Sequence, residues 1–97
     1  MFEELDPLLH SQLRLAIMSV LISVDSAEFN FLLDKTGATR GNLSVQITKL
    51  ADAGYIGVNK SFRKNFPLTT CKITSKGVEA FEKYVKALQT YLSKENK

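Results

Sequence analysis

The feature that most constrains the fold is the segment TGATRGNLSVQITKLADAGYI, residues 36–56, in which a glycine-containing turn separates two stretches of helical periodicity. Gly37 tolerates the left-handed backbone that commonly ends a helix, and Thr39 has a side chain suited to capping the next one. We predict that this next helix spans residues 40–53 and that Gly54 stops it. Two helices joined by a turn of three or four residues form a helix-turn-helix.

The helix over residues 40–53 has two different faces. Leu43, Ile47 and Leu50 follow each other at helical spacing and form a narrow apolar stripe. The opposite face begins with Arg40 and neutral hydrogen-bonding side chains, and it lacks the Glu/Lys pairing of an ordinary solvated helix. This composition favours a face that contacts another molecule.

The segments before this core indicate one long and two short elements. Asp6-Pro7 is typical of an N-cap followed by the first helical position, which predicts a helix over residues 7–23. A very short strand at Glu28-Phe29 and a helix over residues 31–36, capped by Asn30, are expected next.

The segments after the core predict a hairpin and a last helix. β-prone runs begin at Ile56 and at Leu68, with a polar, basic tip over residues 61–67 between them. The last helix should span residues 75–92, because its apolar residues alternate at spacings of three and four, as in a heptad seam. Gly77 in its first turn costs about 1 kcal/mol relative to Ala, so we expect another backbone to approach there.

The predicted fold class is therefore α+β, mostly α: a three-helix core, a two-stranded β-hairpin and a long C-terminal helix. A chain of 97 residues fits one domain, residues 1–97. Residues 94–97 are expected to fray.

Charge is distributed unevenly along the chain. Eight basic residues and a single acid, Asp52, lie between Lys35 and Lys76, so this span carries +7 although the whole chain carries +3. Such a block can be only a solvated face, or it can bind a polyanion.

Several classes of function lack support in the sequence. His10 is the only histidine and Cys71 the only cysteine, so neither a zinc site of the Cys/His type nor a disulfide is expected within one chain. We find no nucleophile–base pair and no glycine-rich phosphate loop, and therefore expect neither an enzyme nor a cofactor. Without a long apolar run or a signal-peptide pattern, the expectation is a cytoplasmic protein that contacts no membrane.

Cys71 itself has two interpretations. Its alternation with Ile73 indicates a small core hydrophobe. A thiol sensor would instead require exposure and a lowered pKa.

Residues 36–56, the hairpin and the segment ITSKG at residues 73–77 together resemble the MarR-like and ArsR-like winged helix-turn-helix transcriptional regulators, in their small single-domain form. The resemblance covers about residues 7–92. It implies a dimeric DNA-binding regulator whose 40–53 helix enters the major groove of double-stranded DNA. Repression is our expectation for its action, although the sequence itself does not give the sign of regulation. The 61–67 hairpin tip would be the wing, which contacts the backbone or minor groove of flanking DNA.

The residue chemistry is compatible with this role. Asn42 and Gln46 can pair bidentately with adenine, Arg40 with guanine, and Val45 can pack on a thymine methyl group. The remaining candidates suit phosphates and salt-dependent affinity: Thr39, Ser44, Thr48, Lys49, Lys60, Arg63 and Lys64. Thr39 could also be only a cap, and Asn42 and Ser44 only polar residues of the first turn.

The terminal helices predict a homodimer, since they have more apolar surface than so small a core can cover. The alternative is that both simply fold onto the core. The candidate interface comprises Leu8, Leu15, Met18, Ile22, Val78, Phe81, Tyr84, Val85, Leu88, Tyr91 and Leu92. A dimer implies a pseudo-palindromic site with half-sites about 34 Å apart. The interface could hold a small apolar effector, although no polar constellation points to one.

A second function class remains open, a winged-helix module that binds another protein without specific DNA recognition. Such a module would more often expose an apolar patch on the recognition face. The basic block and the Arg63-Lys64 pair at the hairpin tip favour DNA instead.

Overall fold

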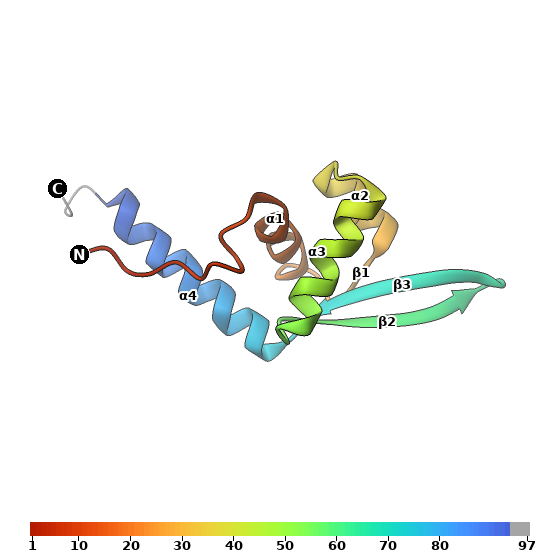
Figure 1. Cartoon of the computed structure of the whole chain (residues 1–97). Coiled ribbons are helices and arrows are strands. Elements are labelled where there is room, and N and C mark those ends of the chain that lie inside the picture. Colours follow the sequence, from red (N-terminus) through yellow and green to blue (C-terminus); the bar gives the residue numbers. More distant parts are fainter. Residues whose placement is uncertain (94–97) are drawn as a thin grey trace.

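The computed structural model describes residues 1–93, and residues 94–97, which were expected to fray, lie outside that range. The element order is α1 (Gln12–Leu21), β1 (Ala27–Glu28), α2 (Phe29–Thr36), α3 (Arg40–Asp52), β2 (Ile56–Arg63), β3 (Phe66–Ile73) and α4 (Ser75–Leu92). The three strands form an antiparallel sheet in the order β1-β3-β2. The β2–β3 hairpin extends from the body in one direction and α4 in the other (Figure 1). This architecture confirms the predicted fold class.

The first helix is shorter than the sequence predicts. The residues after Asp6 form a separate turn, in which Asp6 Oδ1 accepts from the Leu8 amide at 2.9 Å and the Asp6 carbonyl accepts from His10. Ser11 then has extended backbone, φ −151° and ψ 128°, so α1 begins only at Gln12. The Asp-Pro signal thus caps a turn rather than the helix. Smaller errors follow: β1 lies one residue earlier than predicted, and α2 begins at Phe29, with Glu28 rather than Asn30 at its N-cap.

The helix-turn-helix forms as predicted. Gly37 ends α2 with φ 70°, and its amide donates to the Leu33 carbonyl at 3.0 Å. Thr39 caps α3, since its Oγ1 accepts from the Asn42 amide at 3.2 Å. Gly54 follows α3 with φ 81°, although the helix itself already ends at Asp52.

The core lies between the three helices and the sheet. The predicted stripe of α3 is buried, and it meets buried side chains of α1 and β3: Leu43, Ile47, Leu50, Ile17, Met18, Leu21 and Cys71. Cys71 is only 1% exposed, and burial raises the pKa of its thiol. The prediction of a small core hydrophobe is therefore confirmed, and the environment disfavours the reactive thiolate.

The hairpin is longer and its tip tighter than predicted. The strands pair as far as Arg63 and Phe66, so only Lys64 and Asn65 form the turn rather than residues 61–67. Both turn residues have positive φ, 50° and 68°, as a two-residue type I′ hairpin turn requires. Pro67 is tolerated within β3 because β1 pairs only with Cys71 and Thr70, which leaves the outer part of β3 as an edge.

The start of α4 is fixed against the junction between α3 and β2. Thr74 caps the helix by accepting from the Gly77 amide at 3.0 Å, and its hydroxyl donates to the Gly54 carbonyl at 2.6 Å. A Cβ at Gly77 would overlap the Tyr55 carbonyl and lie 2.9 Å from Ile73 Cγ1. The predicted close approach of another backbone is confirmed.

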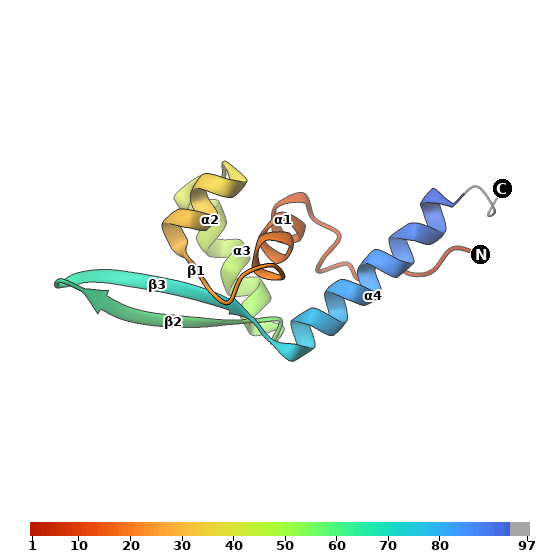
Figure 2. The same ribbon diagram turned by 180° about the vertical axis from the view of Figure 1, so that it is seen from behind.

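Beyond this point α4 projects away from the body, and the N-terminal segment runs beside it (Figure 2). The Phe2 and Tyr91 rings stack with centroids 4.9 Å apart, and the Tyr91 hydroxyl donates to the Glu3 carbonyl at 2.7 Å. The described protein is elongated, with extents of 57 × 25 × 21 Å. None of the helices within residues 1–93 is long and apolar enough to cross a membrane.

Candidate nucleic-acid interface

The outward face of α3 presents most of the residues that the sequence selects. Val45 is 51% exposed although it is apolar. Gln46 is half-buried. The six polar or charged candidates around Val45 are exposed as well: Thr39, Arg40, Asn42, Ser44, Thr48 and Lys49. The face is therefore continuous and mostly polar, with one apolar side chain at its middle.

The hairpin borders this face on one side. Lys60, Arg63 and Lys64 are all exposed on it. Ser44 and Thr48 of α3 and Lys60 of β2 line one hollow of about 270 Å³. The fold thus brings three of the predicted phosphate-binding residues, two from the helix and one from the hairpin, to one hollow.

Arg40 does not extend freely from the start of α3. Its Nη2 donates to Asn30 Oδ1 at 2.8 Å, and its guanidinium lies 5.6 Å from the centre of the Phe29 ring. Both partners belong to α2. The predicted guanine contact therefore requires Arg40 to turn away from α2.

Arg63 also has a partner in the structure. Its Nη2 lies 3.0 Å from Glu28 Oε2, with the two side chains 61% and 42% exposed. Exposed ion pairs contribute little stability, so this pair leaves Arg63 able to exchange Glu28 for another anion. Lys64 lies one residue further out, at the turn itself.

Arg14, which was not among the predicted site residues, reaches the outward face of α3 from α1. Its Nη1 donates to Gln46 Oε1 at 2.5 Å, and Gln46 Nε2 donates to Asn42 Oδ1 at 3.0 Å. The contact spans 32 positions of the sequence, so only the fold reveals it. The available signal was that Arg14 is the one charged residue in the sequence of α1.

The predicted dimer residues fall into two groups. Met18 is fully buried and Tyr84 is 3% exposed. Met18 belongs to the core, and the Tyr84 hydroxyl lies 2.9 Å from His10 Nδ1. These two side chains offer no surface to a partner, so their assignment to the interface was wrong.

The other nine retain exposed surface. They are half-buried or exposed: Leu8, Leu15, Ile22, Val78, Phe81, Val85, Leu88, Tyr91 and Leu92. Ile22, Phe81 and Val85 line a groove of about 510 Å³ between the end of α1 and α4, and Glu82, Lys86 and Gln89 complete its lining.

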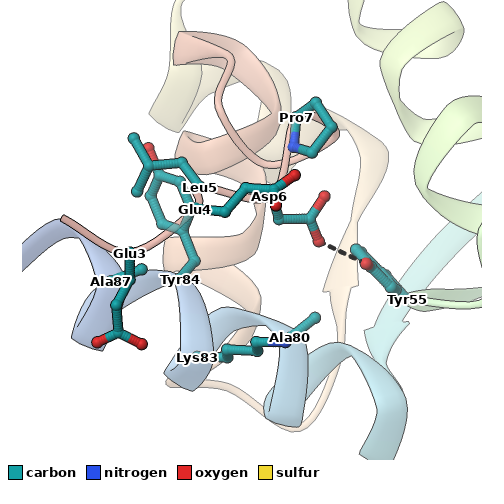
Figure 3. A pocket seen from close by; sticks show the side chains of 10 residues that line it. All are labelled: Glu3, Glu4, Leu5, Asp6, Pro7, Tyr55, Ala80, Lys83, Tyr84 and Ala87. Atoms are coloured by element: carbon teal, nitrogen blue, oxygen red, sulfur yellow. Dashed lines mark hydrogen bonds between the residues drawn. The ribbon is translucent and has the colours of Figure 1, made fainter.

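A further hollow, of about 540 Å³, lies between the N-terminal segment, α4 and Tyr55 (Figure 3). The Tyr55 hydroxyl donates to Asp6 Oδ2 at 2.5 Å, and this hydrogen bond is the main reason why the pKa of Tyr55 rises to about 12. Glu3, Glu4 and Lys83 also line the hollow. Tyr55 lies three residues after the end of α3 at Asp52, so this hydrogen bond connects the N-terminal segment to the end of α3.

Within residues 1–93, no three His, Cys, Asp or Glu side chains gather where they could hold a metal ion.

Comparison with known proteins identifies relatives of this arrangement. A family model described as a winged helix DNA-binding domain matches residues 13–92. An uncharacterised protein of Methanocaldococcus jannaschii is 37% identical over 76 residues, which cover 78% of this chain and 83% of that protein.

Two solved structures are also similar. The transcriptional regulator homologue of Pyrococcus horikoshii OT3 has a TM-score of 0.81 and 27% identity, over 88% of this chain and 84% of its own. PadR of Bacillus subtilis, solved in complex with operator DNA, has a TM-score of 0.69 and 14% identity, over 77% of this chain and 48% of its own. The second likeness is one of fold.

Proposed function

This chain belongs to the winged helix DNA-binding domain family, and we propose that it is a transcriptional regulator that binds a specific double-stranded DNA site. The observation that carries the proposal is the exposed polar face of α3 beside a hairpin with three exposed cations, Lys60, Arg63 and Lys64. In this arrangement α3 lies in the major groove and the β2–β3 hairpin is the wing. PadR, which shares this fold, was solved in complex with operator DNA, and this supports the proposal that the present chain also binds DNA.

The two surfaces have different tasks in this mechanism. A major groove about 12 Å wide admits one helix, and Asn42 and Val45 point outward to contact base edges. Ser44, Thr48 and Lys60 belong to the lining of the hollow between helix and wing, together with apolar side chains such as Ile47 and Val58. In the proposed complex, their polar groups contact a phosphate at the edge of the groove. Phosphate contacts position the protein, and base contacts select the sequence.

We further propose that the regulator acts as a homodimer on a pseudo-palindromic operator. A second copy would cover the groove formed by Ile22, Phe81 and Val85. Glu82 and Lys86 on its lining carry opposite charges, so Glu82 of each copy can pair with Lys86 of the other in a two-fold contact, where one patch meets a copy of itself. The proposed outcome is repression, because occupation of an operator is enough to exclude polymerase and needs no additional surface.

One observation favours the alternative of a protein-binding module. Phe62 and Phe66 on the wing are both 74% exposed, and exposed aromatic side chains are common in protein interfaces. They lie beside Arg63 and Lys64, so the same wing would be the contact surface in either case. Binding experiments with DNA separate the two functions.

The test of DNA binding is the affinity for duplex DNA at low and moderate salt. Replacing both Arg63 and Lys64 by Ala should weaken binding to all sequences. It should also make the fall of log affinity with log salt shallower, with the magnitude of the slope smaller by about 2. Lys83→Ala removes an exposed charge of α4 and should leave this slope unchanged. Absence of duplex binding at low salt would reject the proposed function and leave the protein-binding module.

A further inference from the structure

We propose that Arg14 is a positioning residue that fixes the direction of the hydrogen bonds on the recognition helix, so that Asn42 reads a base and Gln46 does not. The inference rests on the proposed function, because it concerns how α3 selects its DNA sequence. It concerns a relay of three side chains from two helices: Arg14 of α1, and Gln46 and Asn42 of α3.

The first link of the relay is held firmly. Arg14 is half-buried, and its Nε donates to the Leu8 carbonyl at 2.5 Å while its Nη1 donates to Gln46 Oε1 at 2.5 Å. The Leu8 carbonyl belongs to the turn that precedes α1, so the guanidinium is anchored at a second point. A guanidinium carries only donors, and whatever atom faces it must therefore be an acceptor.

This property settles the orientation of the Gln46 amide. The oxygen and nitrogen of an amide are ordinarily assigned from their hydrogen-bond partners, and here a donor-only partner requires Oε1 to face Arg14. Nε2 is then directed toward Asn42, where it donates to Oδ1 at 3.0 Å. The polarity set by Arg14 is thus transmitted one turn along the exposed side of α3.

The relay gives the side-chain amides of Gln46 and Asn42 different roles toward DNA. Bidentate pairing of Gln46 with adenine needs its oxygen and its nitrogen together, but the oxygen is turned to Arg14 and one N–H is used by Asn42. Asn42 is exposed, and the relay occupies one lone pair of its oxygen and neither N–H group. Asn42 therefore presents two donors and a single remaining acceptor site.

The base that suits Asn42 follows from this inventory. Guanine presents two acceptors, N7 and O6, to the major groove, whereas adenine presents one acceptor and one donor, and cytosine presents a donor. Asn42 keeps the one donor and the one acceptor that adenine N7 and N6 require, so adenine is the base that it suits. Arg14 would thereby influence a base that it does not touch.

The competing explanation is that Arg14 only adds positive charge or supports the packing of α1. Loss of a charge weakens binding to every sequence alike and lowers the salt slope. Loss of the relay changes the preference at one base position. The two explanations therefore predict different measurements on the same variants.

The experiment selects duplexes from a library randomised over two helical turns, roughly 21 base pairs, using the full chain. Asn42→Ala identifies the position that Asn42 reads. Arg14→Met and Gln46→Ala should each relax the preference at that same position, about tenfold. Arg14→Met should have no further effect on preference in the Asn42→Ala background, because the two substitutions remove one pathway.

Controls keep the result decisive. Arg14→Lys retains the charge and a donor-only head group, and should keep the preference. Gln46→Ala leaves the bond from Arg14 to the Leu8 carbonyl intact, so it tests the relay even where Arg14→Met unfolds. Uniform weakening of all sequences by Arg14→Met and Gln46→Ala, with preference unchanged, would overturn the relay while leaving the proposed function in place. A wild-type protein that enriches no sequence would overturn both.

Discussion

At the scale of single residues, Gly77 is the glycine at which an added Cβ would meet the closest neighbours. The Tyr55 carbonyl occupies the place of its missing Cβ, and that carbonyl also accepts from the Thr74 amide at 3.0 Å, so it cannot move aside freely. The junction between α3, β2 and α4 therefore depends on the absence of one methyl group.

We predict that Gly77→Ala destabilises the protein by about 2 kcal/mol, because overpacking against a backbone atom exceeds the gain in helix propensity. Denaturation in urea measures the difference. Gly41→Ala in α3 is the matched control, since a Cβ there meets no heavy atom within 4 Å in the described structure. It should leave stability unchanged or raise it by about 0.5 kcal/mol. Similar losses in both variants would contradict this account.

The hydrogen bond between Tyr55 and Asp6 is a second feature at this scale, and its contribution to the stability of the fold depends on pH. The folded protein raises the pKa of Tyr55 to about 12, chiefly through the hydrogen bond to Asp6. The protonated phenol is the form that folding favours, so its contribution is fully present below about pH 10 and is lost as the pH rises through about 12.

We therefore predict that the stability difference between wild type and Tyr55→Phe is constant below about pH 10 and disappears toward about pH 12. Urea denaturation of both proteins at each pH isolates this difference from the titration of lysines, which they share. Asp6→Asn, which removes the carboxylate but not the burial of the phenol, should reduce the alkaline dependence of the difference. A difference that persists unchanged above pH 12 would exclude the hydrogen bond as its source.

At the scale of elements, the sequence predicts the position of a helix most accurately when one face of the helix is buried and a capping residue marks each end. The helix α3 satisfies both conditions, with its buried stripe and with Thr39 and Gly54 at its ends. The start of α1 was predicted too early because an Asp side chain can cap an isolated turn as well as a helix. Asp6 caps a single turn here, and the extended backbone of Ser11 separates that turn from α1.

Two other features, the bounds of the hairpin and one contact of the candidate site, could not be predicted from the local sequence pattern. The outer hairpin is exposed on both faces, so it carries no alternation of apolar and polar residues that could mark its strands. The exposure of Asn42 and Val45 follows from helical periodicity within one segment. The contact between Arg14 and Gln46 does not, because it depends on how α1 packs across α3.

At the scale of the whole molecule, the elongated shape places α4 away from the wing (Figure 1). In the proposed function, one protomer binds DNA at one end and a second protomer at the other. The separation of the recognition helices in the proposed dimer would be set by α4 and by the groove beside α1. A functional dimer requires this separation to match one helical turn, about 34 Å.

We predict that Val85→Glu converts the proposed dimer into monomers, because it places a second carboxylate beside Ile22 and Phe81, the apolar part of the groove. Light scattering at micromolar concentration measures the mass. Lys83→Glu adds the same side chain at an exposed position of the same helix and should keep the dimer. A wild-type protein that is monomeric under these conditions would contradict the proposed assembly.

The tight turn of the hairpin has a consequence for how such a protein can be improved. Lys64 and Asn65 both adopt a left-handed backbone that glycine would adopt with less strain. Glycine at position 64 would relax the turn and also remove the outermost cation of the wing. If Lys64 contacts DNA as proposed, laboratory selection for heat resistance alone should enrich variants with a higher melting temperature and weaker DNA binding. A selection that includes DNA binding should retain lysine.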